Sequence, residues 1–181
     1  MRDKGSSTVS LVITALFAAV LAVCAWVAVP AAVPVTLQTF GVYAALLLLG
    51  GRQGTVAVAV YLLLGAVGAP VVAGFRGGPG VLFGASGGYL VGFLLMALLY
   101  WLFTARLGDK PAVRIAALVA GQLVAYLFGT LWFMAVYRWS PAPTLMACVV
   151  PFLLPDALKL ALALLVIPRL RAKISKVFTI C

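Results

Sequence analysis

Long apolar segments separated by short charged intervals are the feature of this chain that most limits how it can fold. Six such segments can be delimited, at 9–29, 35–50, 55–67, 86–104, 112–136 and 144–167. A run of about 20 apolar residues forms a helix long enough to cross the hydrocarbon core of a bilayer. Helices also satisfy their own backbone hydrogen bonds where no water is available. The sequence therefore predicts an all-α integral membrane protein, a single domain over residues 1–181 built as a bundle of six transmembrane helices.

Composition agrees with this class and argues against others. Of the 181 residues, 66% are hydrophobic and 9% are charged, whereas about a quarter of the residues in soluble domains are charged. The chain has no histidine and its three cysteines show no motif spacing, so we expect no metal, no cofactor and no enzymatic activity of its own. In a soluble protein, a net charge of +10 would suggest a nucleic-acid partner. In a membrane protein, the positions of the basic residues indicate which loops are cytoplasmic.

The positive charges are divided unevenly between the two ends of the expected helices. One side of the membrane receives only Arg76 and Arg138. The other side receives ten basic residues: Arg2, Lys4, Arg52, Arg106, Lys110, Arg114, Arg169, Arg171, Lys173 and Lys176. Lysine and arginine are enriched in cytoplasmic loops. We therefore expect both termini in the cytoplasm, that is, an N-in/C-in topology.

The interval between the third and fourth expected helices is unusual. Gly68 to Gly84 contains six glycines and two prolines and is apolar apart from Arg76. Such a sequence disfavours a regular helix, and an apolar loop is poorly suited to water. We expect it to fold back over the outward face of the bundle as a cap, where irregular backbone is buried in protein.

Two charged residues interrupt the last apolar segment, PFLLPDALKLALALLVIP (151–168). Asp156 and Lys159 are three residues apart, so they share one face of a helix. Pro155 suits the first turn of a helix, which would put the Asp156 carboxylate at the positive end of the helix dipole. Charge at membrane depth is rare and marks functional sites. The alternative is an ion pair that only fixes helix packing.

Several polar and aromatic side chains are expected near that pair at the outward face. Together they predict a small, mostly apolar pocket with a few convergent polar groups. Its candidate residues are Thr36, Gln38, Arg76, Phe83, Ser86, Gly87, Tyr89, Tyr126, Trp132, Asp156 and Lys159. Carboxylates accept hydrogen bonds and ammonium groups donate them, so the pocket suits a neutral or anionic small molecule with N–H donors and oxygen acceptors.

The first apolar segment carries a stripe of alanines. Ala15 and Ala19 form one i, i+4 pair, and Ala18 and Ala22 form the neighbouring one. Small residues at this spacing let another helix approach closely. That helix can belong to this bundle or to a partner protein.

Four motifs in order resemble the BioY family, the biotin-binding S components of energy-coupling-factor (ECF) transporters. They are PVTLQTF (34–40), the glycine-rich loop running into LFGASGGYLVGF (82–93), YLFGTLWF (126–133) and PFLLPDALK (151–159). The resemblance implies a six-helix, multi-pass subunit of a prokaryotic cell membrane that captures biotin from outside. It also implies a transmembrane coupling protein (EcfT or BioN) and two cytoplasmic ATPases as partners. The family's Ala-x-x-x-Ala stripe contacts the coupling protein, here Ala15 and Ala19, with Ala18 and Ala22 in the adjacent register.

One position departs from the family pattern. The family has GPTGGY before its fourth helix, whereas this chain has GASGGY, so Ala85 replaces a proline and Ser86 keeps the hydroxyl. Biotin suits the predicted pocket: its ureido group offers two N–H donors and a carbonyl, and its tail is anionic. Asp156 can accept from a ureido N–H, and Lys159 can meet a carbonyl or carboxylate. Arg76 can bind the carboxylate or remain solvated.

Three other classes fit less well. An ion-coupled secondary transporter of a vitamin-like solute is the main alternative, but the chain has one intramembrane acid and no apparent inverted repeat. A membrane enzyme needs a nucleophile or a metal cluster. A purely structural subunit leaves the Asp156–Lys159 pair unexplained.

Overall fold

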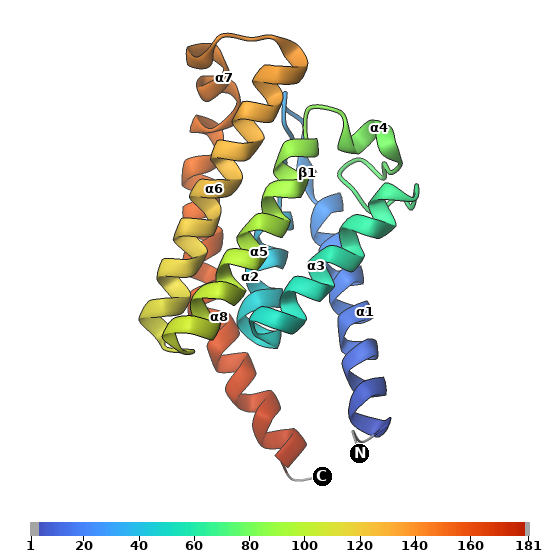
Figure 1. The fold of residues 1–181 in the computed structure, drawn as a ribbon, viewed down its shortest axis with the longest axis vertical. Coiled ribbons are helices and arrows are strands. Elements are labelled where there is room, and N and C mark those ends of the chain that lie inside the picture. Colours follow the sequence, from blue (N-terminus) through green and yellow to red (C-terminus); the bar gives the residue numbers. More distant parts are fainter. Residues whose placement is uncertain (1–3, 180–181) are drawn as a thin grey trace.

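The computed structural model describes residues 4–179 of the chain. The helices are α1 (Lys4–Trp26), α2 (Gln38–Leu49), α3 (Gly51–Ala66), α4 (Pro79–Leu82), α5 (Gly87–Leu107), α6 (Pro111–Tyr137), α7 (Pro141–Cys148) and α8 (Val150–Thr179). A two-residue hairpin, β1 (Ala28–Val29) with β2 (Val35–Thr36), joins α1 to α2. The elements form an elongated helical bundle (Figure 1).

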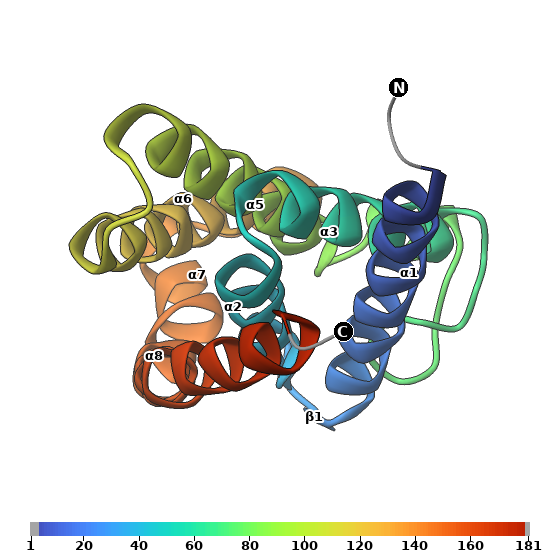
Figure 2. The ribbon, with the colours of Figure 1, turned by 90° about the horizontal axis from the view of Figure 1, so that it is seen from below.

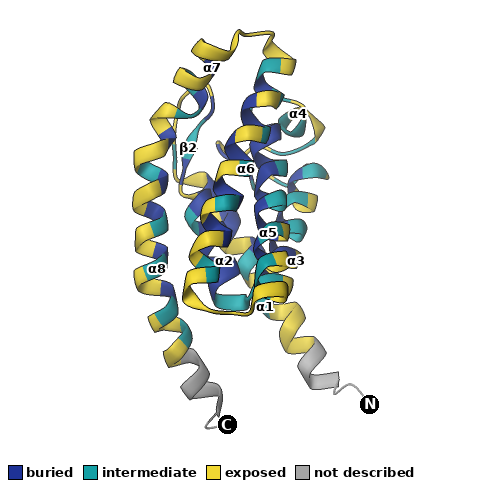
Figure 3. Cartoon of the chain, turned by 60° about the vertical axis from the view of Figure 1, so that its left-hand side comes forward, coloured by how far each residue is buried: buried dark blue, intermediate teal, exposed yellow. Residues whose placement is uncertain are grey.

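Within the part of the chain that the structure describes, four stretches are long and apolar enough to cross a membrane: Thr8–Trp26, Gly87–Leu107, Pro111–Tyr137 and Pro141–Lys173. Their outer faces carry exposed leucine, valine and isoleucine side chains, such as Leu11, Leu123 and Leu154. Figure 3 shows this exposed surface along α1 and α8. Apolar surface on this scale is unusual on a soluble monomer and marks an interaction surface, here one suited to lipid. The prediction of a helical membrane protein is therefore confirmed.

Helix α2 lies at the centre of the bundle, packed against α1, α3, α5 and α8 (Figure 2). Its residues from Gln38 to Leu47 are buried apart from the half-buried Phe40. Its 12 residues span only about 18 Å. Neighbouring helices surround its buried residues.

The connections gather at two opposite ends of the bundle (Figure 1). One end carries the β1–β2 hairpin, α4 and α7. The other end carries the start of α1, the α2–α3 and α5–α6 turns and the last turns of α8. The glycine-rich interval and the Asp156 part of α8 thus lie toward the first end.

Helices α5 and α6 pack closely because glycines face bulky partners. A β-carbon at Gly129 of α6 would lie 2.5 Å from the ring of Tyr89, and one at Gly88 of α5 would clash with Trp132. Only glycine allows these approaches. The contact places Tyr89 and Tyr126 on the inner side of the bundle, where both are buried.

The glycine-rich interval folds over the end of the bundle, and residues 79–82 form the single turn α4. Trp26, at the end of α1, donates its Nε1–H to the Pro70 carbonyl at 2.9 Å and stacks on Phe75. A tight loop closes between Val72 and Arg76 through two backbone hydrogen bonds. Val72 and Ala73 are buried by this fold, as expected for a cap.

Two expected helix boundaries differ from the structure. Residues 51–54 lie between the expected segments 35–50 and 55–67, but they form the first turn of α3, and the chain turns at Gly50, which has a φ of +81°. The last helix was expected to end at Pro168 with Pro155 in its first turn. Instead α8 begins at Val150 and continues through both prolines. Asp156 is therefore in the second turn, and the expected position at the positive helix end is wrong.

The two alanine registers of α1 have different environments. Ala18 and Ala22 are 2% and 5% exposed and belong to the hydrophobic core of the bundle. Ala15 and Ala19 are exposed. The structure thus assigns Ala18 and Ala22 to internal packing and leaves Ala15 and Ala19 on the surface.

Candidate functional site

The Asp156 carboxylate lies inside the bundle and accepts three hydrogen bonds. Its Oδ1 accepts from Lys159 Nζ at 2.7 Å, and its Oδ2 accepts from Tyr126 Oη at 2.8 Å and Gln122 Nε2 at 3.1 Å. The residue is 3% exposed. Burying a carboxylate is costly unless it is paired and hydrogen-bonded, and this arrangement meets both conditions.

A second layer supports this arrangement. Tyr43 of α2 donates its hydroxyl to Gln122 Oε1 at 2.7 Å, so α2, α6 and α8 are joined by one hydrogen-bond chain. Tyr43 is fully buried. The chain holds the Gln122 amide with its nitrogen toward Asp156.

A cavity of about 40 Å³ lies beside Asp156, toward the end of the bundle that carries the cap. Its walls come from the hairpin region, the cap, α2, α5, α6 and α8. The lining residues are Val33, Pro34, Thr36, Gln38, Thr39, Val72, Ala73, Ser86, Tyr89, Leu90, Phe93, Gln122, Ala125, Tyr126, Phe152 and Asp156. The wall is mostly apolar with a few polar groups, as is typical of small-molecule sites.

Six of the predicted site residues meet around this cavity. They are Thr36, Gln38, Ser86, Tyr89, Tyr126 and Asp156. The ring of Tyr89 stacks on Phe152 with centroids 6.2 Å apart. Its hydroxyl donates to the Cys148 carbonyl at 2.7 Å, which ties the end of α7 to α5.

Lys159 does not line the cavity, although it was predicted to face the ligand. It is 7% exposed, and the bond to Asp156 is the one hydrogen bond that its side chain makes within residues 8–173. Its position makes it the counter-charge of the carboxylate. A buried carboxylate without that counter-charge would be strongly destabilising.

Arg76 also lies outside the cavity, in an adjoining hollow of about 530 Å³. The hollow and the cavity share Pro34 and Ser86 in their walls. The Arg76 Nε donates to the Ala73 carbonyl at 3.0 Å, and the residue is exposed. The guanidinium thus stands at the outer approach to the cavity.

Three further predicted residues have other positions. Phe83 is 69% exposed and does not reach the cavity. Trp132 donates its Nε1–H to the Gly84 carbonyl at 3.1 Å and so fastens the cap to α6. Gly87 is buried where a β-carbon would clash with the Leu82 carbonyl, which lets the cap turn directly into α5.

The sequence analysis missed several lining residues. Gln122 had a readable signal, since it is polar within an apolar segment and lies four residues before Tyr126, on the same helix face. The aromatic wall comes from Phe93 and Phe152 in place of Phe83 and Trp132. Nothing in the sequence distinguishes these phenylalanines from others that face lipid.

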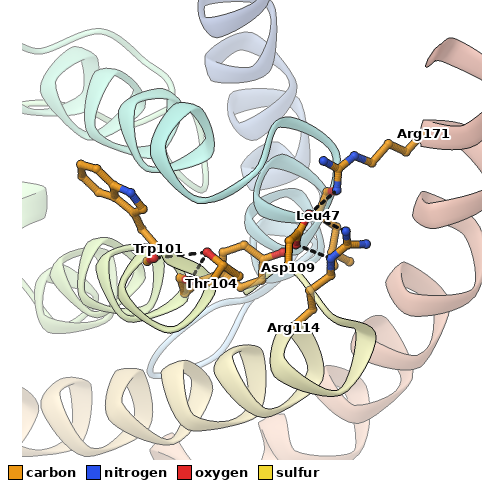
Figure 4. A network of polar contacts seen from close by, with 7 residues as sticks. Leu47, Trp101, Thr104, Asp109, Arg114 and Arg171 are labelled. Atoms are coloured by element: carbon orange, nitrogen blue, oxygen red, sulfur yellow. Dashed lines mark hydrogen bonds and ion pairs between the residues drawn. The ribbon is translucent and has the colours of Figure 1, made fainter. Parts of the chain in front are cut away.

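A second ionic cluster lies at the opposite end of the bundle (Figure 4). Asp109, between α5 and α6, accepts from Arg114 Nε and Nη2 at 2.6 Å each, and from Arg171 Nη1 at 3.3 Å. The Arg114 guanidinium beside Asp109 lowers the pKa of that carboxyl below its usual range. The Asp109 side chain is 46% exposed. Arg171 also donates to the Leu47 carbonyl at 3.4 Å, so the cluster joins α8 to α2.

The site at Asp156 can bind but offers no evident reaction chemistry. Within the described part of the chain no group of three or more metal-ligating side chains comes together. The cavity wall carries one carboxylate, two amides and five hydroxyl-bearing residues, which are two tyrosines, two threonines and a serine. Such a wall selects a ligand by hydrogen bonds.

The sequence model of the BioY family matches residues 1–176. The chain belongs to the BioY family.

Curated relatives and a solved structure agree with this assignment. The chain is 40% identical to the biotin transporter BioY of Thermotoga maritima over 162 residues, which is 89% of this chain and 95% of the relative. It is 40% identical to a probable biotin transporter BioY of Pyrococcus horikoshii, over 90% and 95% of the two chains. The fold matches a crystal structure of the S-component for biotin from an ECF-type ABC transporter, with a TM-score of 0.85, 25% identity and 95% of each chain covered.

Proposed function

We propose that this BioY-family chain is the biotin-binding subunit of an ECF-type importer in a prokaryotic cell membrane. It captures biotin from the outer side and has no ATPase activity of its own. The observation that carries the proposal is the buried Asp156 carboxylate at the wall of a capped cavity, in a chain whose relatives are named biotin transporters. The Asp156 carboxylate can accept a further hydrogen bond besides its three internal ones, and a ureido N–H of biotin can donate it.

The contacts we assign to biotin follow the geometry of the cavity. Asp156 and Gln38 bind the polar ring, and Phe93, Tyr89 and Phe152 pack on its apolar atoms. Arg76, in the adjoining hollow, meets the anionic tail as it enters. Lys159 is the counter-charge of Asp156 and orients its carboxylate without touching the ligand. Phe83 and Trp132 act on the cap.

We further propose six membrane spans, with both termini in the cytoplasm. The spans are α1, α2, α3, α5, α6 and the α7–α8 unit, in which the short α2 and α3 are complemented by the hairpin and the cap. The basic residues Arg52, Arg106, Lys110 and Arg171 lie at the end opposite the cap, which favours that end as cytoplasmic. The side chains of Arg2, Lys4 and Lys176 lie outside those that the structure describes. A C-terminal reporter active only in the cytoplasm tests this orientation.

Direct titration of the purified protein with biotin tests the function. We expect saturable binding of one biotin, and no binding of thiamine or riboflavin at the same concentrations. Biotin carries ureido N–H groups that can donate to Asp156, and its ring carries apolar atoms that match the apolar part of the cavity wall. Equal binding of unrelated vitamins, or none of biotin, would contradict the proposal.

The coupling surface can be tested on α1. We propose that the exposed Ala15 and Ala19 contact a transmembrane coupling protein, EcfT or BioN, which works with two cytoplasmic ATPases. Ala15→Trp should spare biotin binding by the isolated subunit and abolish ATP-driven uptake, because a bulky side chain blocks close helix approach. Leu16→Trp is the matched control on the same helix, since Leu16 is already large and 59% exposed. Uptake that survives Ala15→Trp would rule out this contact.

A further inference from the structure

Two buried tyrosines behind the cavity wall each bond a glutamine of that wall. Tyr43 Oη lies 2.7 Å from Gln122 Oε1, and Tyr61 Oη lies 2.7 Å from Gln38 Nε2. Neither tyrosine lines the cavity, and they are 0% and 1% exposed. The two pairs look equivalent, but their hydrogen bonds run in opposite directions.

The direction at Gln122 is fixed by Asp156. A carboxylate can only accept, so the amide end of Gln122 beside it must be the nitrogen. The amide oxygen then faces Tyr43, whose hydroxyl donates to it. Both ends of the Gln122 amide are thus hydrogen-bonded within the protein, the nitrogen to Asp156 and the oxygen to Tyr43.

The direction at Gln38 is fixed by the cap. The Val71 backbone carbonyl can only accept, and Tyr61 donates its one hydroxyl proton to it at 3.2 Å. The Tyr61 oxygen must therefore accept from Gln38, whose amide nitrogen faces Tyr61. The Gln38 carbonyl oxygen is left at the opposite end of the amide, and among residues 8–173 no group donates to it.

We propose that Tyr61 is a specificity-determining positioning residue, which holds Gln38 with its carbonyl oxygen available to the cavity. The wall then offers two acceptors, the Gln38 carbonyl and the Asp156 carboxylate, and so selects a ligand with two N–H donors. The inference rests on the proposed function and deepens it, since the ureido ring of biotin carries two such donors. Because Val71 belongs to the cap, the orientation of Gln38 is set only while the cap is seated.

The test compares biotin with two cyclic carbamate analogues, in each of which oxygen replaces one ureido N–H. Affinities are measured for the wild type, Tyr61→Phe, Gln38→Met and Tyr43→Phe. In the wild type we expect the analogue that lacks the N–H at Gln38 to bind about tenfold more weakly than biotin. Gln38→Met identifies that analogue, because its discrimination disappears in this variant.

Tyr61→Phe should reduce discrimination against the same analogue to about twofold or less, because the freed amide can turn and donate to the ring oxygen. Tyr43→Phe removes an equally buried hydroxyl, but the ratio of its affinities for biotin and for this analogue should equal that of the wild type. A general loss of stability lowers both affinities together and leaves the ratio unchanged, so the ratio reports positioning and not folding.

Each outcome decides the point. The inference is overturned if Tyr61→Phe keeps the wild-type ratio of affinities for biotin and the analogue. It is also overturned if the wild type binds biotin and both analogues equally. Where Tyr61→Phe yields no folded protein, Gln38→Met decides: retained discrimination overturns the inference and lost discrimination supports it. A wild type that binds no biotin at all overturns the proposed function itself.

Discussion

Among residues 8–173, two aspartates form ion pairs of nearly equal length but in very different surroundings. Asp156 lies 2.7 Å from Lys159, and its side chain is 4% exposed. Asp109 lies 2.6 Å from Arg114, and its side chain is 46% exposed. The distances alone would rank the pairs as equivalent.

Burial separates their energetic roles. Exposed ion pairs contribute about 0–1 kcal/mol because water and salt screen the charges. Removing one partner of a buried pair costs about 3–5 kcal/mol because the other charge is left unpaired. Asp109 therefore fastens the α5–α6 turn to α8 only weakly, whereas Asp156 can be retained at such depth only by its partners. A carboxylate that needs this much support and also faces a cavity is better explained by ligand binding than by packing.

The largest effect is expected when the buried carboxylate is replaced by an amide. Asp156→Asn leaves the Lys159 ammonium unpaired inside the bundle and replaces an acceptor-only group with one that also donates. Thermal unfolding in detergent should show a loss of about 3–5 kcal/mol. Biotin affinity should fall at least about tenfold. An unchanged melting temperature would show that water reaches this pair and would remove the contrast with Asp109.

An intermediate effect is expected when one donor to Asp156 is removed. Tyr126→Phe deletes a hydrogen bond to a charged group but leaves those from Lys159 and Gln122, so the stability loss should be about 1.5–3 kcal/mol. Tyr137→Phe is the control in the same helix, because Tyr137 is 47% exposed. Its effect should remain within about 0.5 kcal/mol. Equal losses in both variants would contradict the importance of the Asp156 network.

The smallest effect is expected at the exposed carboxylate. Asp109→Asn should change stability by about 0–1 kcal/mol at neutral pH and leave biotin binding unchanged. Because Arg114 lowers the pKa of Asp109, its contribution exists above the unfolded pKa of about 3.9 and is lost as the pH falls through the lower folded pKa. Melting curves of wild type and variant should therefore converge in acid. A difference that grows with acidity would have the wrong sign.

Much of the helical architecture could be predicted from the apolar segments, because lipid leaves few alternatives to a helix. The boundaries were less predictable. Polar residues at 51–54 resemble a turn, yet they begin α3 because Gly50 alone makes the turn. Pro155 suggested a helix start, but α8 continues through it. A proline removes only one backbone hydrogen bond, and α8 packs against α2 and α7.

The candidate site was predictable where charge or amide groups interrupt apolar sequence. Asp156, Lys159 and Gln38 stood out for that reason. Tyr43 and Tyr61 did not, because a tyrosine in an apolar helix looks the same whether it packs in the core or holds a glutamine. Phe83 was misplaced because the path of a glycine-rich loop depends on backbone turns that its composition does not specify. That the residues around the cavity bind biotin is a prediction.

The most direct test of the central claim is biotin binding by the double variant Asp156→Asn with Lys159→Met, measured beside each single variant. Removing both charges relieves the unpaired ion, so folding should recover relative to the single variants. The account predicts a well-folded double variant whose biotin affinity remains at least about tenfold below wild type. Near wild-type affinity in that folded protein would show that the pair serves packing alone and would contradict the assignment of the site.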